Sequence, residues 1–92
     1  MLDERQKKLV RDRLSRVQGQ IGGVMKMVEA DRYCVDVLNQ TSAIVSAIRN
    51  VENIVLENHL NTCVADAMRS NDPDEQNEKT TEVMNIIGTY RR

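Results

Sequence analysis

Apolar residues recur along the first third of the chain at alternating spacings of four and three residues. This period places them on one face of an α-helix, which we predict to run from about residue 4 to about residue 29. Gly19, Gly22 and Gly23 interrupt the pattern. Each glycine costs about 1 kcal/mol of helix propensity relative to alanine, so we expect another helix to pack closely there. The apolar stripe consists of Val10, Leu14, Val17, Ile21, Val24 and Val28.

The second apolar stripe lies in a segment that contains no glycine or proline from Cys34 to Asp72. It predicts a helix over residues 33–69, which would be about 55 Å long at a rise of 1.5 Å per residue. A helix of this length needs a partner helix to cover its apolar face. We expect Asp31 to cap its N-terminus. The stripe consists of Val37, Thr41, Ile44, Ile48, Val51 and Val55.

A polar segment from Ser70 to Asp74 then breaks the helix. Asp72 is placed to cap a third helix with Pro73 at its first position, and we predict this helix over residues 73–90. Its apolar face holds Val83, Ile86, Ile87 and Tyr90. The pattern therefore predicts an all-α protein of three helices with a long central helix, in a single domain over residues 1–92.

The composition agrees with a helical bundle, because the chain of 92 residues contains no Phe or Trp and only two Tyr. A chain this short buries a modest core, so we expect an oligomer. The charged N-terminus is not followed by an apolar run long enough for a signal peptide or a membrane span, and we expect a cytoplasmic protein. In a reducing compartment the two cysteines are expected to be thiols, redox sensors or metal ligands rather than a structural disulfide.

The formal net charge of −1 conceals a basic block near the N-terminus. Residues 5–16 hold six cations against one anion, whereas residues 17–92 hold seven cations against eleven anions. The block is expected either to contact DNA phosphates or to form a solvated helix face, and gathering several copies in an oligomer favours the first. The sequence has no helix-turn-helix or zinc-finger signature. The cations of the block are Arg5, Lys7, Lys8, Arg11, Arg13 and Arg16.

Cys34, His59 and Cys63 are the only cysteines and the only histidine of the chain. On a helix, His59 and Cys63 lie one turn apart on the same face, as two ligands of one metal ion require. Cys34 precedes His59 by a helical rise of about 37 Å, so one chain cannot bring the three together. Taken singly, each residue is also compatible with an ordinary place in a helical core.

An antiparallel pair of long helices from two chains would bring the three residues together despite this distance. If two copies cross near residues 47 and 48, Cys34 of one chain lies opposite the interval between His59 and Cys63 of the other. Two thiolates and one imidazole are a soft, three-donor set that favours Cu(I), whereas Zn(II) normally takes a fourth ligand and Ni(II) prefers more nitrogen and oxygen. The spacing therefore predicts two equivalent intersubunit Cu(I) sites in a dimer.

Three motifs carry a family resemblance: Arg13-Leu-x-Arg16-Val-x-Gly19, Tyr33-Cys34-Val-Asp-Val-Leu-x-Gln40, and Asn58-His59-Leu-x-x-Cys63. In order, spacing and identity they resemble the copper-sensing operon repressors, the CsoR-like (CsoR/RcnR/FrmR) family, which also includes nickel/cobalt, formaldehyde and persulfide sensors. The likeness covers residues 10–70 closely and the third helix loosely.

The resemblance implies an antiparallel dimer assembled into a tetramer that binds double-stranded operator DNA as the apo-repressor and releases it when the effector binds. It matches Cys34, His59 and Cys63 to the copper ligands. It matches Tyr33 to a residue outside the ligand set, and Glu82, with Glu78 as a competitor, to a carboxylate that bonds the ligand histidine. Arg13 and Arg49 lie at or next to positions linked to DNA binding in the family.

The chain differs from the other sensors of this family. It lacks the N-terminal histidine of nickel/cobalt sensors, it has the second cysteine that formaldehyde sensors lack, and it has the histidine that persulfide sensors generally lack. Copper is the best fit, with a persulfide sensor using Cys34 and Cys63, or a sensor of Ni(II) or another metal, as alternatives. A copper carrier is disfavoured by the basic block. No enzyme activity is expected, because no nucleophile has an adjacent base outside the ligand set.

Overall fold

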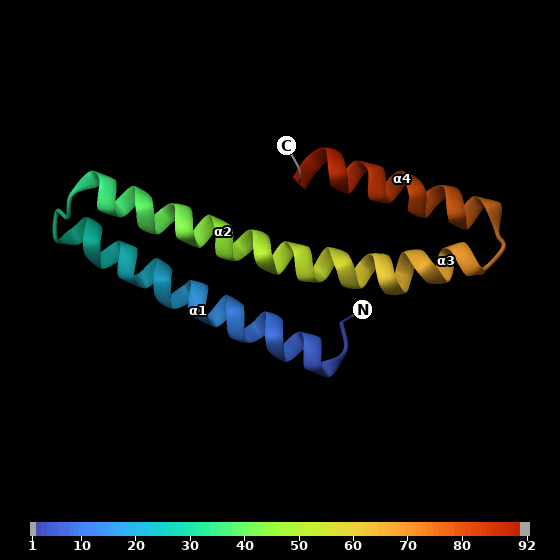
Figure 1. Ribbon diagram of the computed structural model, residues 1–92, viewed down its shortest axis with the longest axis horizontal. Helices are drawn as coiled ribbons and strands as arrows, with labels where there is room; N and C mark the ends of the chain where they lie inside the picture. Colours follow the sequence, from blue (N-terminus) through green and yellow to red (C-terminus); the bar gives the residue numbers. More distant parts are fainter. Residues whose placement is uncertain (1, 91–92) are drawn as a thin grey trace. The chain divides into compact units, whose positions relative to one another are not determined.

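A computed structural model describes residues 2–90, and the described chain is helical with no β-strand. The helices are α1 (Glu4–Glu29), α2 (Cys34–His59), α3 (Ala65–Arg69) and α4 (Pro73–Tyr90), and one π-helical turn, η1 (Leu60–Val64), joins α2 to α3 (Figure 1). The all-α class is confirmed. The three predicted helices begin and end within a residue of their expected bounds, but the π-helical turn within the second was not predicted.

The described chain divides into two units, residues 2–56 and residues 57–90. In the first unit, α1 begins with a capping box, in which the Asp3 carboxylate accepts the Gln6 backbone N–H and the Gln6 side chain accepts that of Asp3. Alternate members of the predicted stripes are buried, namely Val10, Val17, Ile44 and Val51. These four residues of the stripes therefore supply the small core of this unit, and other stripe residues remain exposed.

The turn between α1 and α2 corrects the predicted role of Asp31. This residue has a left-handed backbone, with φ of 54°. Its backbone N–H donates to the carbonyl of Val28, and the backbone N–H of Arg32 donates to the carbonyl of Met27. These two bonds form a Schellman motif, which ends a helix. Asp31 thus terminates α1 rather than capping α2, in which the N–H groups of Asp36 and Val37 bond to the carbonyl of Tyr33.

The expectation of close packing at the α1 glycines was wrong for this chain's own helices. A Cβ placed on Gly19, Gly22 or Gly23 would meet no atom within 4 Å in the described chain. All three nevertheless lie inside α1. The rest of the helix therefore holds them in helical geometry without a tight contact inside the chain.

In the second unit, a polar turn connects α3 to α4. Asn71 adopts the left-handed conformation, with φ of 60°, and the Asp72 carboxylate accepts the backbone N–H of Asp74 at 3.0 Å. Asp72 is therefore the predicted cap of the third helix, with Pro73 as its first residue. The side chain of Gln76 donates to the Met68 carbonyl at 3.1 Å, which fastens α4 to the end of α3.

Much of the apolar surface of the single chain stays exposed. In α1 and α2, Leu14, Ile21, Leu38, Val45 and Val55 are each at least 41% exposed. Residues 2–90 contain no helix long and apolar enough to cross a membrane. Exposed apolar stripes on water-facing helices indicate surfaces that bind another protein chain.

Candidate metal centre

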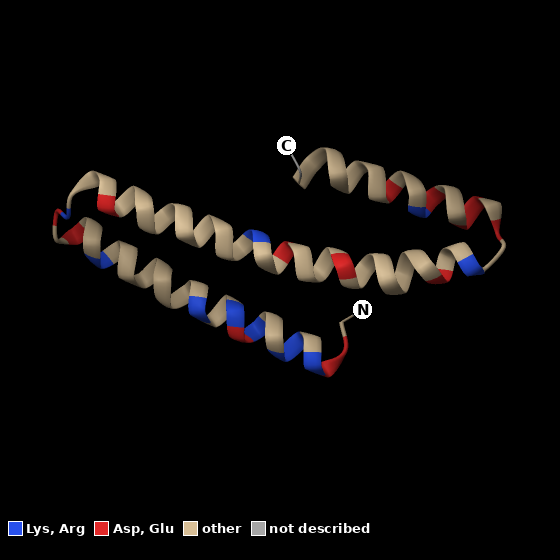
Figure 2. Ribbon diagram, viewed as in Figure 1, with Lys and Arg blue, Asp and Glu red and all other residues tan. Residues whose placement is uncertain are grey.

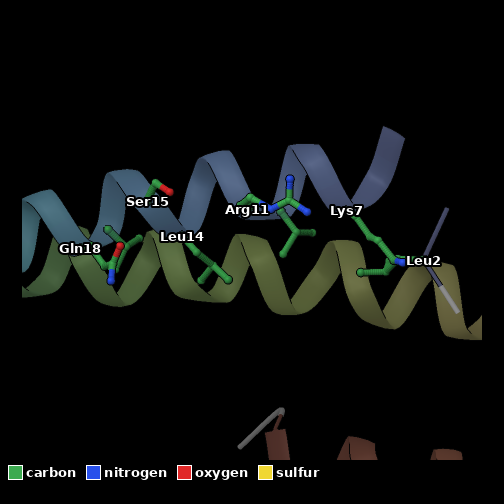
Figure 3. Close-up of a pocket in the computed structure, with 8 residues that line it drawn as sticks. Leu2, Lys7, Arg11, Leu14, Ser15 and Gln18 are labelled. Atoms are coloured by element: carbon green, nitrogen blue, oxygen red, sulfur yellow. The ribbon is translucent and has the colours of Figure 1, made fainter. Parts of the chain in front are cut away.

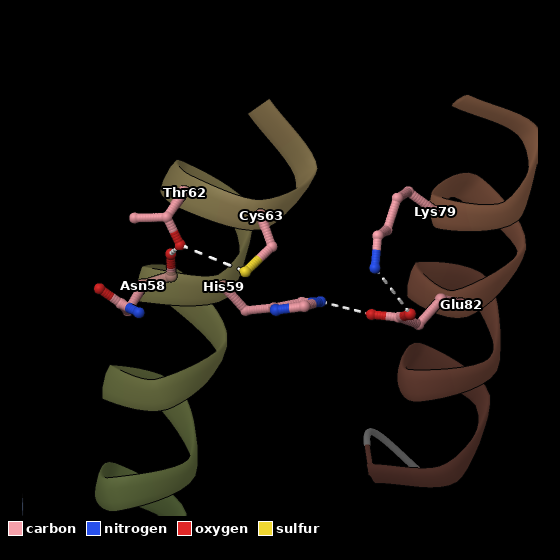
Figure 4. A network of polar contacts seen from close by, with 6 residues as sticks. All are labelled: Asn58, His59, Thr62, Cys63, Lys79 and Glu82. Atoms are coloured by element: carbon pink, nitrogen blue, oxygen red, sulfur yellow. Dashed lines mark hydrogen bonds and ion pairs between the residues drawn. The ribbon is translucent and has the colours of Figure 1, made fainter. Parts of the chain in front are cut away.

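His59 and Cys63 lie at the junction of α2 and the π-helical turn. His59 is the last residue of α2 and Cys63 the fourth residue of η1, and Figure 4 shows the His59 ring extending toward α4. The backbone N–H of Ala65 bonds to the carbonyl of Leu60, five residues earlier, which is the bond that defines a π-helix. Such turns are frequent at functional sites. The unit of residues 57–90 therefore presents one imidazole and one thiol together.

The His59 ring is held by a carboxylate of α4. Its Nε2 lies 2.5 Å from Oε1 of Glu82, and the two side chains are 27% and 38% exposed. The pKa of Glu82 lies below its ordinary value, first because of the hydrogen bond with His59 and then because of the Lys79 ammonium, against an opposing effect of desolvation. Since an ionised carboxylate can only accept, Nε2 carries a proton in this contact, and the lone pair of a neutral ring is then on Nδ1.

Glu82 rather than Glu78 makes this contact, as the resemblance implied. The other carboxylate oxygen of Glu82, Oε2, lies 3.4 Å from Nζ of Lys79, one helical turn earlier on α4 (Figure 4). The contact connects the end of α2 with α4 through one polar network inside a single unit.

The Cys63 thiol has a pKa below its ordinary value. The largest cause is a hydrogen bond with Thr62, whose Oγ1 lies 3.6 Å from the Cys63 sulfur, and the His59 ring adds to it, whereas desolvation opposes both. The same hydroxyl lies 2.8 Å from the Asn58 carbonyl oxygen. A hydroxyl has one proton, so it bonds one of these two acceptors at a time. The arrangement favours the thiolate, which is the form that binds metals.

Cys34 is the first residue of α2 and is exposed, next to Tyr33, which is 70% exposed. Neither cysteine of the described chain forms a disulfide. Within residues 2–90, no three His, Cys, Asp or Glu side chains are grouped closely enough to hold a metal ion. One described chain thus brings two of the three predicted donors together, and Cys34 belongs to the other unit.

The predicted basic residues are all exposed along the N-terminal half of α1 (Figure 2). Two of them are paired on their own helix, Lys8 with Asp12 at 2.9 Å and Lys7 with Glu4 at 3.4 Å. Lys7 and Arg11 also line an open groove of about 530 Å³ with the apolar residues Leu2, Val10 and Leu14 (Figure 3). Arg49 is exposed on α2. The block therefore combines cations with uncovered apolar surface.

Sequence reasoning missed Thr62 and Lys79. Both are ordinary surface residue types, and their roles depend on neighbours that only the fold reveals. The sequence spacing of each could have indicated its contact. Thr62 stands four residues after Asn58, whose carbonyl a helical threonine can reach, and next to Cys63. Lys79 stands three residues before Glu82, so the two are neighbours on one helix face.

The fold and the site define an all-helical protein in which the Cys63 thiol and the His59 imidazole lie together beside a carboxylate of α4. Comparison with known families agrees, because residues 6–89 match the model of the metal-sensitive transcriptional repressors. The chain belongs to this family.

Individual relatives are copper-sensing repressors. The chain is 46% identical over 71 residues to CsoR of Bacillus subtilis, covering 77% of this chain and 70% of that protein. It is 48% identical over 61 residues to RicR of Mycobacterium tuberculosis, covering 66% of this chain and 64% of that protein. The alignment thus spans just under two thirds of RicR.

Solved structures confirm the fold. The crystal structure of the copper-sensing repressor CsoR with Cu(I) from Geobacillus thermodenitrificans matches with a TM-score of 0.89 and 38% identity, covering 100% of this chain and 93% of that one. A variant of the formaldehyde-responsive regulator FrmR from Salmonella enterica serovar Typhimurium matches with a TM-score of 0.77 and 22% identity, covering 98% and 99%. The second likeness concerns the fold alone.

Proposed function

We propose that this protein is a Cu(I)-sensing transcriptional repressor. The apo-protein binds operator DNA through the basic residues of α1, with Arg49 of α2, and Cu(I) binding at an intersubunit site releases it. The observation that carries this proposal is the pairing of His59 with Glu82 beside Cys63, which leaves an imidazole nitrogen and a soft sulfur donor together.

The donor set fits Cu(I). Nε2 of His59 is engaged by Glu82, so Nδ1 is the nitrogen left to bind a metal. Cys63 supplies a thiolate, and Cys34 of a second chain would supply the other. Thiolates and imidazole in a three-coordinate set suit Cu(I) better than harder metals. Bound Cu(I) would supply a positive centre that ties the ends of two chains together.

The assembly follows from two features of the chain. The 26-residue helix α2 begins at Cys34 and ends at His59, so a helical rise of about 37 Å separates them. The exposed apolar stripes of α1 and α2 also require cover. We infer an antiparallel dimer that places Cys34 of one chain beside His59 and Cys63 of the other, and pairing of dimers into a tetramer gathers the basic blocks.

Release of DNA then requires two quaternary states. Drawing Cys34 toward His59 and Cys63 favours the state whose basic surfaces no longer match the phosphate spacing of the duplex. Because coupling is reciprocal, operator DNA must weaken Cu(I) binding by the same factor by which Cu(I) weakens DNA binding. Typical coupling free energies of about 1–3 kcal/mol correspond to factors of roughly 5–150.

The test is a titration of the protein on fluorescent operator DNA, followed by anisotropy. We expect binding by the apo-protein that weakens with added salt, and release by Cu(I) but not by Ni(II). Absence of DNA binding at low salt would refute the proposal. Release by a persulfide donor instead, with added sulfur mass bridging Cys34 and Cys63, would identify a sulfane-sulfur sensor.

A further inference from the structure

The Glu82 carboxylate is held from two sides. Its Oε1 faces Nε2 of His59 at 2.5 Å, and its Oε2 faces Nζ of Lys79 at 3.4 Å. Lys79 and Glu82 are one turn apart on α4, whereas His59 lies at the end of α2. Each oxygen thus has its own cationic or N–H partner, and the two partners lie on different helices.

The Lys79–Glu82 pair differs from the other same-helix ion pairs of residues 2–90. Its side chains are 27% and 38% exposed, against 74% and 60% for Lys8–Asp12 and 76% and 77% for Arg69–Asp66. Partial burial reduces solvent screening and restricts the lysine, so this pair is better able to fix a geometry than an open surface pair.

A glutamate has three rotatable side-chain bonds and loses much rotamer freedom when it is fixed. With Oε2 tethered to Lys79, the carboxylate plane is set and Oε1 points at the imidazole (Figure 4). We propose that Lys79 is a positioning residue of the metal site: it orients Glu82 so that His59 keeps its proton on Nε2 and presents Nδ1 to the metal.

The first test uses the apo-protein and does not depend on copper or DNA. His59 is the only histidine in the chain, so nitrogen NMR of the imidazole ring gives one unambiguous tautomer ratio. The measurement is made at about pH 8.5, above the ordinary imidazole pKa of about 6.5. We expect the Nε2–H form to dominate in the wild type and to lose population in Lys79→Met, with Lys79→Arg restoring it.

Arg69→Met is the matched control. It removes one cation and one i,i+3 ion pair from the same unit, but that pair is 76% and 77% exposed and does not involve the His59 network. Its tautomer ratio should equal that of the wild type. Should Lys79→Met fail to fold, Lys79→Gln provides the same loss of charge with a polar end group, and thermal unfolding of both variants separates loss of fold from loss of orientation.

The second test rests on the proposed function. Lys79→Met should reduce the factor by which Cu(I) weakens DNA binding by about two- to fivefold, the range that partly exposed ion pairs contribute, and should lower Cu(I) affinity of the free protein by a smaller factor, because both thiolates remain. Lys79→Arg should recover the wild-type factor. A purely structural role would change stability without separating these two quantities.

The two tests fail independently. An unchanged His59 tautomer ratio in both Lys79→Met and Lys79→Gln would overturn the positioning role, even in a protein that senses Cu(I) normally. An altered ratio in a protein that does not respond to Cu(I) would support the positioning role and refute the proposed function.

Discussion

At the scale of single residues, the proposed site depends on neighbouring side chains as well as on the proposed donors themselves. The Thr62 hydroxyl lies within reach of both the Asn58 carbonyl and the Cys63 sulfur, and its bond to the sulfur is the largest cause of the lowered thiol pKa. When the thiol ionises, the hydroxyl proton can turn from the carbonyl to the sulfur. Thr62 therefore favours the ionised form of the Cys63 thiol, which is a ligand of the proposed site.

Thr62→Val should raise the pKa of the Cys63 thiol, because valine keeps the shape of threonine and removes the hydroxyl. We would measure the rate of iodoacetamide alkylation against pH in a Cys34→Ser background, so that Cys63 is the only thiol. The midpoint should move to higher pH than in the parent. Thr62→Ser retains the hydroxyl and should leave the midpoint near the parent value, and an unmoved midpoint in Thr62→Val would contradict this role.

His59→Ala should damage regulation more than it damages Cu(I) affinity. Both thiolates remain to bind the metal, but the link from the site to Glu82 and α4 is lost. The measurement compares Cu(I) affinity of the free protein with the factor by which Cu(I) weakens DNA binding. Equal losses in the two quantities would show that the imidazole contributes as a ligand only.

At the scale of elements, local sequence rules predicted the helices well and the turns less well. Periodic apolar residues fixed the long helices, and Asp72 and Pro73 marked the start of α4 correctly. Asp31 was placed on the wrong helix, because aspartate suits both an N-cap and a left-handed C-terminal position, and only the backbone decides. No residue type or pattern marks a π-helical turn in a sequence, so Leu60–Val64 was predicted as ordinary α-helix.

The residues of the site could be predicted from the sequence only in part. His59 and Cys63 are rare residues at helical spacing, so they stand out in the sequence. Lys79 and Glu82 are two of many charged residues, and their selection depends on α4 lying against the end of α2 within the unit of residues 57–90. Contacts between helices are set by packing, which a single sequence does not display.

Asp31→Gly should stabilise the protein by about 0.5–1 kcal/mol, because glycine adopts the left-handed conformation without the steric cost that other residues pay. Ala30→Gly, one residue earlier at a φ of −90°, should instead lower stability, since glycine there gains nothing and adds freedom to the unfolded chain. Chemical denaturation of both variants measures the difference. Equal effects at the two positions would contradict the Schellman assignment.

At the scale of the whole molecule, the single chain leaves apolar stripes uncovered, so folding and assembly are expected to be linked. Wild-type thermal unfolding should shift to higher temperature as the protein concentration rises, because association stabilises the folded state by mass action. Calorimetry over a hundredfold range of concentration checks this. A midpoint that does not depend on concentration would indicate a stable folded monomer.

An intersubunit site can be tested by complementation. Cys34→Ser and Cys63→Ser chains should each lack complete sites, whereas refolding an equal mixture should produce heterodimers with one complete site. With random pairing, about a quarter of the wild-type Cu(I) sites should return. Copper titration against a competing chelator counts them. If mixing restores none, the three donors do not combine across an antiparallel pair.

The uninterrupted run of α2 from Cys34 to His59 has a consequence for the length of the protein as well as for its sequence. In the proposed dimer, the number of residues in this helix would set the spacing between Cys34 and His59. One inserted residue anywhere along it would turn one end relative to the other by about 100° and lengthen it by about 1.5 Å, misaligning both sites of a dimer at once. The middle of the helix bears no ligand, yet a change in its length should disrupt the proposed sites as much as loss of a ligand would. Substitution of its exposed residues should be tolerated.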